Sequence, residues 1–162
     1  MLIAIVSDTH SRYATVDRVV ETLGQQRVEL VLHCGDIEDA ATVQRFRGLP
    51  THFVFGNCDT ERDELRQEMT ASGLKLHEPF GDLEVGGSKL AWIHGDDRRL
   101  FQDIQRSGQF DYLFYGHTHV AEEHRSGPTL VVNPGALHRA RPKSFVLLEL
   151  PAGKLERITL DS

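Results

Sequence analysis

The sequence predicts an α/β fold in which two packed β-sheets lie between outer helices. In the first half of the chain, short apolar runs alternate with helical patterns. This β-α-β-α-β-α order implies a parallel sheet with right-handed crossovers. The second half is richer in strand-like segments. The 162 residues contain no linker, repeat or low-complexity segment, so residues 1–162 are expected to form a single domain.

The elements of the first half follow from apolar runs and from helical spacing. Residues 2–6 are apolar and rich in β-branched side chains, which predicts a buried strand. The helical face expected next is formed by Val16, Val19, Val20 and Leu23, and Gly24 is expected to end this helix. The other elements expected here are strands at 28–32 and 53–55 and helices at 40–46 and 60–71.

The elements of the second half are mostly strands. Residues 81–95 have the pattern of a hairpin that turns at Gly86 and Gly87. Leu100, Phe101 and Ile104 indicate one more helix, which ends near Gly108. The remaining apolar runs predict strands within residues 111–116, 129–135, 144–150 and 154–160.

Composition excludes several classes of protein. Hydrophobic residues make up 40% and charged residues 26%, an ordinary globular profile. The formal net charge of -6 argues against stable nucleic-acid binding, but it does not argue against a small phosphate ester held at a metal. The N-terminal apolar run is too short for a signal peptide, and no run approaches the roughly 20 residues of a membrane helix. Two cysteines do not suggest a disulfide framework, so we expect a reduced, cytoplasmic protein without membrane association.

Two histidines follow the apolar run in "YLFYGHTHV", residues 112–120. Residues i and i+2 of an extended segment point the same way, so His117 and His119 are expected to converge if the segment is extended. A metal ion is the usual partner of converging neutral imidazoles. Two unrelated loop histidines are the alternative, and the rest of the chain decides between them.

Side chains able to bind a metal follow five of the predicted strands. In α/β sheets, sites form at the carboxyl ends of strands. Two carboxylates, one amide oxygen and four imidazoles are, by residue type, the ligands of a two-metal site. Asp36 has two carboxylate oxygens and is therefore able to bridge two ions. The full set is Asp8, His10, Asp36, Asn57, His94, His117 and His119.

Taken together, "SDTH", "GD", "GNCD", "HG", "GHTH" and "NPG" resemble the motifs of the calcineurin-like metallophosphoesterases, in particular the small single-domain prokaryotic phosphodiesterase group. The resemblance spans residues 5 to about 142. It implies a four-layer α/β/β/α sandwich with two mixed β-sheets flanked by helices. It also implies two divalent metal ions, with manganese expected and iron, zinc or nickel as alternatives.

The resemblance also assigns the ligands and the activity. One ion would be held by Asp8, His10, Asp36 and His119, and the other by Asp36, Asn57, His94 and His117. The activity implied is hydrolysis of phosphodiesters in a small phosphate-ester substrate, by attack of a hydroxide that bridges the two metals. Asp36, Asn57 and His94 are the expected catalytic residues.

The alternative is a non-catalytic binding or scaffold protein that retains a metal, similar to the retromer subunit of the same fold. That protein has a degraded metal site, whereas all seven ligand positions here carry good ligands, which favours an enzyme. A homo-oligomer is compatible with the sequence, which does not fix the oligomeric state.

Three positions depart from the pattern of many relatives. Cys58 stands where larger relatives have a histidine that is thought to protonate the leaving group. Asp96 replaces a histidine, and Ala136 replaces a serine. The sequence therefore predicts metal binding more firmly than it predicts turnover of demanding substrates.

Six residues are candidates for contact with the substrate. Arginines can hold phosphate with two hydrogen bonds, but an ordinary solvated arginine is an equal alternative at each position. Residues 133–135 have turn composition, and their amides are candidates to face a phosphate. His138 is also a candidate proton donor. The six are Cys58, Arg98, Asn133, Gly135, His138 and Arg139. Asp59 is expected to cap the following helix, and His33 to pack in the core.

Overall fold

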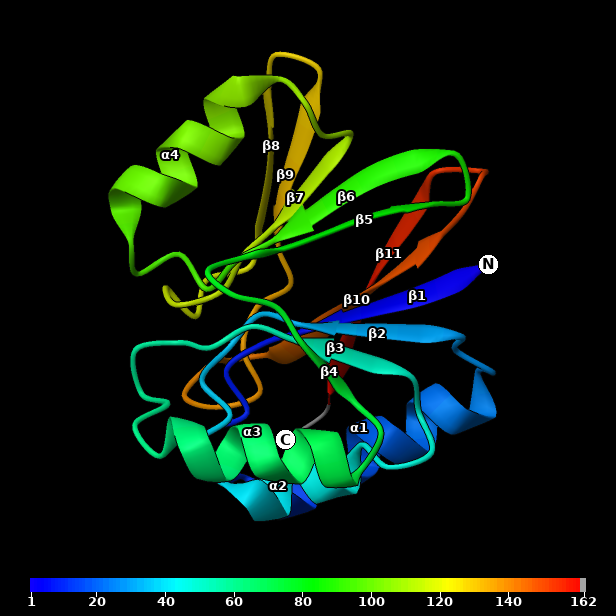
Figure 1. Ribbon diagram of the computed structural model, residues 1–162. Coiled ribbons are helices and arrows are strands. Elements are labelled where there is room, and N and C mark those ends of the chain that lie inside the picture. The colour runs from blue at the N-terminus through cyan, green and yellow to red at the C-terminus, as the bar shows by residue number, and fades with distance from the viewer. Residues whose placement is uncertain (161–162) are drawn as a thin grey trace.

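The computed structural model of the protein describes residues 1–160. Two mixed β-sheets pack face to face, with three helices on the outside of one sheet and one helix on the outside of the other (Figure 1). The predicted four-layer α/β/β/α sandwich is confirmed.

The first sheet has the strand order β11-β10-β1-β2-β3-β4. Strands β1 to β4 are parallel, β10 is antiparallel to β1, and β11 is antiparallel to β10. The strands are β1 (Leu2–Val6), β2 (Leu30–His33), β3 (Thr51–Phe53), β4 (Lys75–Leu76), β10 (Lys143–Glu149) and β11 (Lys154–Leu160).

The second sheet has the order β5-β6-β7-β9-β8, with a parallel centre of β6, β7 and β9 and an antiparallel strand at each edge. The strands are β5 (Gly81–Val85), β6 (Ser88–Trp92), β7 (Tyr112–Phe114), β8 (Glu122–Ser126) and β9 (Thr129–Asn133).

Helices α1 (Tyr13–Gln25), α2 (Ala40–Arg45) and α3 (Arg62–Ala71) cover the first sheet, and α4 (Arg98–Ser107) covers the second (Figure 1). Of the α1 face predicted from helical spacing, Val16, Val19 and Leu23 are buried and Val20 is half-buried. The helix continues through Gly24, its predicted end, to Gln25. No helix in residues 1–160 is long and apolar enough to cross a membrane.

Strand β1 is buried on both faces, which places its carboxyl end between the layers. Ala4 and Val6 pack toward α1, while Ile3 and Ile5 pack against the second sheet near Trp92. Successive side chains of a strand point to opposite faces, so one apolar run serves both cores. The loops after β1, β2 and β3 meet those after β6 and β7 on the side away from the N-terminus (Figure 1, left).

Four details differ from the sequence prediction. The second strand runs from Leu30 to His33 rather than over 28–32, and the third is Thr51–Phe53 rather than 53–55. Strand β4 has two residues, too few for a pattern. Strand β8 lies at a sheet edge with mostly exposed side chains, so it lacks the apolar residues that mark a buried strand.

Candidate metal centre

The seven residues predicted as ligands converge where the loops of the two sheets meet. Two groups of contacts form. His119 Nε2 lies 3.1 Å and His10 Nε2 3.7 Å from Asp8 Oδ1. In the other group, Asn57 Oδ1 lies 3.0 Å from His94 Nε2 and 3.1 Å from His117 Nδ1.

Asp36 joins the two groups. Its Oδ2 lies 3.4 Å from His10 Nε2 and 3.3 Å from His94 Nε2. Its Oδ1 accepts a hydrogen bond of 2.8 Å from the amide of Cys58, which fixes the carboxylate plane. One carboxylate therefore faces both clusters, as a bridging ligand would.

Hydrogen-bond partners leave one atom of Asp8 and one atom of His94 turned to the centre. Ser7 Oγ donates to Asp8 Oδ2 at 2.6 Å, so Oδ1 is the atom that faces His119. His94 Nδ1 donates to the carbonyl of Cys34 at 2.7 Å, which leaves Nε2 on the side of Asp36. A partner on the far ring nitrogen is the usual support of a metal-bound histidine.

The cluster fits a divalent cation. Asp8 Oδ1 and His10 Nε2 are buried and have no hydrogen-bond partner. The Oδ1 atom of Asn57 and Nε2 of His94 face each other at 3.0 Å, and two acceptors this close repel unless a proton or a cation is present. Residues 1–160 contain three overlapping groups of His, Cys and carboxylate side chains that could hold a metal. Within each group the candidate ligand atoms lie within 4.8 Å of one another, and one group includes Cys58. Mixed imidazole and oxygen ligands suit zinc and divalent iron, manganese or nickel.

The pKa values show that the site favours positive charge. Burial acts to raise the pKa of Asp8, but the imidazoles of His10 and His119 close to its carboxylate outweigh this effect and hold the pKa well below its usual range. Burial acts to lower the pKa of His10, but the neighbouring carboxylates of Asp8 and Glu38 raise it to about 9. The carboxylates thus stabilise a cation here, and a metal would have to displace the proton of His10.

The backbone at the site is strained. The φ angles of the ligands Asp8, His10, Asp36, His117 and His119 lie between +45° and +69°. This left-handed region is unfavourable for residues with a Cβ atom, and such strain gathers at functional sites.

The segment at residues 117–119 is not extended, since both histidines have positive φ. The condition under which His117 and His119 were expected to converge on one ion is therefore not met. They also point to different partners: His117 contacts Asn57 and lies edge-on to the ring of His94, whereas His119 contacts Asp8. The two histidines thus belong to different groups of contacts, and their assignment to two different ions stays a prediction.

Two glycines allow the loops to approach each other. A Cβ atom on Gly56 would lie 2.2 Å from Asp36 Oδ1, and one on Gly116 would lie 2.0 Å from Ser7 Oγ. No side chain fits at either position, because real Cβ contacts below 3.0 Å essentially do not occur.

Asp59 does not cap α3, which is a second correction. Its carboxylate is buried and accepts hydrogen bonds from the amides of residues 36, 37, 38 and 56, so it joins the loops after β2 and β3. The residue before α3 is Glu61, whose side chain makes no cap hydrogen bond. His33 is buried as expected, and it pairs with Thr9 Oγ1 at 3.1 Å.

Sequence reasoning missed Glu38. Its Oε1 lies 2.6 Å from His10 Nδ1, which turns His10 Nε2 toward Asp8 and Asp36. The only signal in the sequence is its place in the acidic run "GDIED", two residues after Asp36.

The candidate substrate residues differ in their surroundings. Asn133 is buried, donates to the carbonyl of Gly116 at 3.1 Å and to Thr118 Oγ1 at 3.0 Å, and accepts from the amide of Gly135. Both residues thus support the histidine loop, and their contact with substrate stays a prediction. Cys58 lies beside Asn57, and burial followed by the charge of Asp36 raises the pKa of its thiol to about 11.

The other three candidates lie at the edges of the site. The His138 ring lies 4.9 Å from that of His10, and its Nδ1 accepts a hydrogen bond of 2.9 Å from Arg12 Nε. Arg139 is exposed, with φ +48°. Arg98 is an exposed first residue of α4, and the hollow beside His94 is lined by Asp96 and other residues but not by Arg98.

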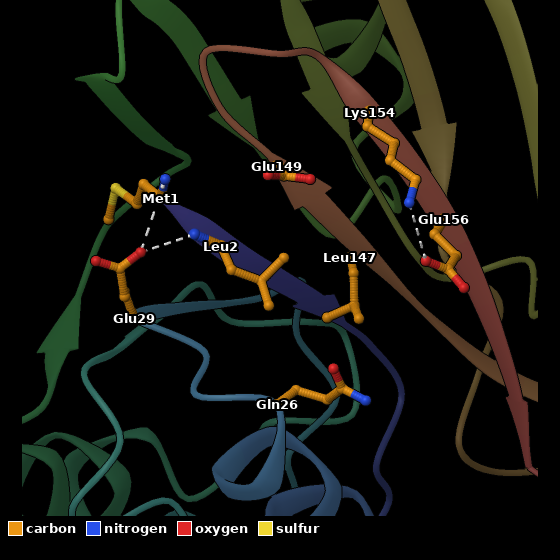
Figure 2. A pocket seen from close by; sticks show the side chains of 8 residues that line it. All are labelled: Met1, Leu2, Gln26, Glu29, Leu147, Glu149, Lys154 and Glu156. Atoms are coloured by element: carbon orange, nitrogen blue, oxygen red, sulfur yellow. Dashed lines mark hydrogen bonds and ion pairs between the residues drawn. The ribbon is translucent and has the colours of Figure 1, made fainter.

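A hollow at the opposite end of β1 has a different character (Figure 2). Most of its charged groups pair with each other: Glu29 contacts the N-terminal ammonium and accepts from the amide of Leu2, and Lys154 lies 3.9 Å from Glu156. The hollow therefore has no set of converging free ligands.

Comparison with known proteins agrees with this geometry. A family model described as the calcineurin-like phosphoesterase superfamily domain matches residues 1–153. The chain is 30% identical over 138 residues to phosphodiesterase MJ0936 of Methanocaldococcus jannaschii, covering 83% of each chain. It is 27% identical to the probable metallophosphoesterase YsnB of Bacillus subtilis, covering 93% of this chain and 85% of the relative.

Solved structures share the fold. The structure of an archaeal phosphodiesterase, described as novel, superimposes with a TM-score of 0.91 at 26% identity, covering 99% of this chain and all of the other. Vps29 of Entamoeba histolytica with zinc gives a TM-score of 0.67 at 21% identity over 99% of this chain and all of that one, a likeness of fold alone.

Proposed function

This chain belongs to the calcineurin-like phosphoesterase superfamily, and from that premise we propose that it is a phosphodiesterase with a dinuclear metal centre. The observation that carries the proposal is the position of Asp36, whose Oδ2 lies within 3.4 Å of a histidine from each cluster. The first metal position is formed by Asp8, His10, Asp36 and His119. The second is formed by Asp36, Asn57, His94 and His117.

Two divalent ions in these positions would lower the pKa of a bound water, so that it could lose its proton near neutral pH, and would offset negative charge on the phosphoryl group. The protein supplies the positions. Glu38 and the carbonyl of Cys34 orient His10 and His94, while the Cys58 amide orients Asp36. These contacts, with the strained backbone, hold the ligands in place before the substrate arrives. Asp36, Asn57 and His94 are the proposed catalytic residues, because they would hold the metal ions that act on the reacting groups.

The leaving group has little help from the side chain next to Asn57. A thiol with a pKa of about 11 is a weak acid at neutral pH, so Cys58 is a poor proton donor. We therefore propose that esters with good leaving groups are cleaved fastest. Arg98, His138 and Arg139 are the proposed contacts for the rest of a small phosphate-ester substrate, with Asn133 and Gly135 behind the histidine loop.

Manganese is the proposed metal, with iron, zinc and nickel as alternatives, because the site mixes imidazole with carboxylate and amide oxygens. A reducing, cytoplasmic location is proposed from the two cysteines, which are free: Cys34 is buried and Cys58 is partly exposed.

A second candidate function is a binding or scaffold role that retains a metal. The likeness of fold to Vps29 favours it, and at 21% identity that likeness concerns the fold alone. The complete ligand set and the similarity to a phosphodiesterase at 30% identity favour the enzyme.

Hydrolysis of bis(p-nitrophenyl) phosphate tests the proposal. The protein is stripped with a chelator and reloaded with manganese, and initial rates are compared with those of the stripped protein. We expect activity only after loading. Asp36→Asn should lose both activity and metal, whereas Asp17→Asn, a surface carboxylate paired with Arg45, should behave as the parent. A fully loaded parent that cleaves no phosphodiester would support the scaffold role.

A further inference from the structure

We propose that a basic groove beside the metal centre binds a second phosphate of the substrate, so that preferred substrates are nucleotide-sized phosphodiesters that carry a further phosphate. The inference rests on the proposed function, because it assumes that the cleaved diester lies at the metal centre.

The groove has a volume of about 1120 Å³. Ligand sites for small molecules typically measure about 300–1,000 Å³, so this groove is large enough for a nucleotide. Among residues 1–160, the side chains that line it are cationic or apolar, with one histidine and no carboxylate. They are Arg12, His138, Arg139, Ala140, Arg141, Pro142, Lys143 and Leu160.

The groove begins at the metal centre. His138 lines it, and the ring of His138 lies 4.9 Å from that of His10 and 6.2 Å from that of His119. Arg12 holds this ring through the hydrogen bond from Nε to Nδ1. A substrate whose diester reaches His10 and His119 would therefore extend past His138 to the cations.

The cationic side chains of the groove form no ion pair with a carboxylate of residues 1–160. Within residues 1–160, no ion pair forms with Arg12, Arg139, Arg141 or Lys143, although Arg12 is bonded to His138. Four arginines elsewhere in residues 1–160 do pair with carboxylates. The pairs are Arg45 with Asp17, Arg47 with Glu68, Arg66 with Asp63 and Glu78, and Arg157 with Glu123.

The chemistry of the groove favours phosphate. Arginine presents a planar fork that matches phosphate oxygens, and three of the groove residues are arginines. Ala140, Pro142 and Leu160 supply apolar surface for a sugar or a base. A long nucleic acid would have to cross the rest of a protein with net charge -6, so a short ligand fits better.

Two chromogenic substrates that differ by one group test the inference. The first is the p-nitrophenyl ester of thymidine 5′-phosphate, and the second is the same compound with a 3′-phosphate. Both release nitrophenolate, so their KM values compare the second phosphate alone. We expect the 3′-phosphate to lower KM of the parent roughly tenfold, the scale of one charge-assisted hydrogen bond.

The variant Arg139→Gln/Arg141→Gln should lose most of this KM ratio. The control Arg27→Gln/Arg106→Gln makes the same change of charge at two exposed positions outside the groove lining and should keep the ratio. Added salt should reduce the ratio in the parent. Equal KM values in the parent, or an unchanged ratio in the groove variant, would overturn the inference while leaving phosphodiesterase activity intact.

A binding measurement tests the groove even if the protein hydrolyses neither ester. If neither ester is hydrolysed, the proposed function fails, and calorimetry with thymidine 3′,5′-bisphosphate and metal-free protein decides about the groove. The groove variant should then bind at least about fivefold more weakly than the control variant, as expected for lost contacts to a charged group. Equal binding by the two variants, or no binding by the parent, would overturn the inference.

Discussion

Replacing Gly56 by alanine is expected to damage the metal centre without unfolding the protein. The added Cβ would lie 2.2 Å from Asp36 Oδ1 and 2.6 Å from the Asp36 amide, whereas ordinary contact begins at 3.4 Å. The Asp36 carboxylate oxygen must therefore shift by about 1.2 Å, and the backbone contact alone requires the two loops to separate by about 0.8 Å, the gaps between these contacts and 3.4 Å. Asn57 and Asp36 lie on these loops, so both proposed metal positions change.

The size of the effect follows from the displacement. A misplacement of about 1 Å near a catalytic centre can cost roughly 100-fold in rate. We expect kcat/KM for bis(p-nitrophenyl) phosphate to fall by about that factor, with weaker manganese binding in a dialysis assay. Circular dichroism should show little change, because the substitution lies in a loop.

Gly24→Ala is the matched control. A Cβ atom on Gly24 meets nothing within 4 Å, and the residue lies in α1. Alanine is favoured over glycine in a helix by about 1 kcal/mol, so this variant should be slightly more stable and fully active. Parent-like activity and metal affinity in Gly56→Ala would refute the close approach of the two loops.

Three further predictions concern single side chains. Glu38→Gln should weaken manganese binding about 10- to 100-fold in a chelator competition, because the partner that orients His10 is weakened; unchanged affinity would contradict this role. Cys58→His should raise turnover of alkyl diesters more than that of nitrophenyl diesters, since a histidine can protonate an alkoxide leaving group near neutral pH; equal gains on both would count against a missing acid. Burial, together with the charges of His77 and Lys75, lowers the pKa of His52 to about 4, below the unfolded value of about 6.5. The unfolded chain therefore binds more protons between these two values, so stability from neutral His52 is complete above pH 6.5 and is lost as the pH falls toward 4. Urea unfolding of metal-free protein should show this loss in the parent and less of it in His52→Gln, and identical pH dependence in the two would disprove the assignment.

The sequence predicted the buried elements well because burial imposes a pattern. The apolar run of β1 and the spacing of Val16, Val19 and Leu23 both arise from packing against a core, and both elements formed as expected. Strand β8 has exposed side chains and pairs only with β9, so its position depends on backbone hydrogen bonds that leave no apolar pattern. The two-residue β4 is below the length at which any period can be recognised.

The seven residues that converge at the candidate site were identified by type and position, since side chains able to bind metal can be recognised at strand ends in a sequence; that they bind metal stays a prediction. Their supports were not identified. Asp59 binds amides more than 20 residues away, at positions 36 to 38, and it has the local appearance of a helix cap. The positive φ angles of His117 and His119 likewise depend on the packed loops around them. Such long-range contacts follow from tertiary structure, which local patterns do not encode.

The central claim is that the cluster around Asp36 holds two metal ions in each chain. Titration of stripped protein with manganese, followed by elemental analysis after removal of free metal, measures this directly. The account predicts saturation at two ions per chain, with the magnetic coupling expected for ions about 3.5–4 Å apart in electron paramagnetic resonance spectra. Saturation at one ion per chain in a folded protein with all seven ligands intact would contradict it.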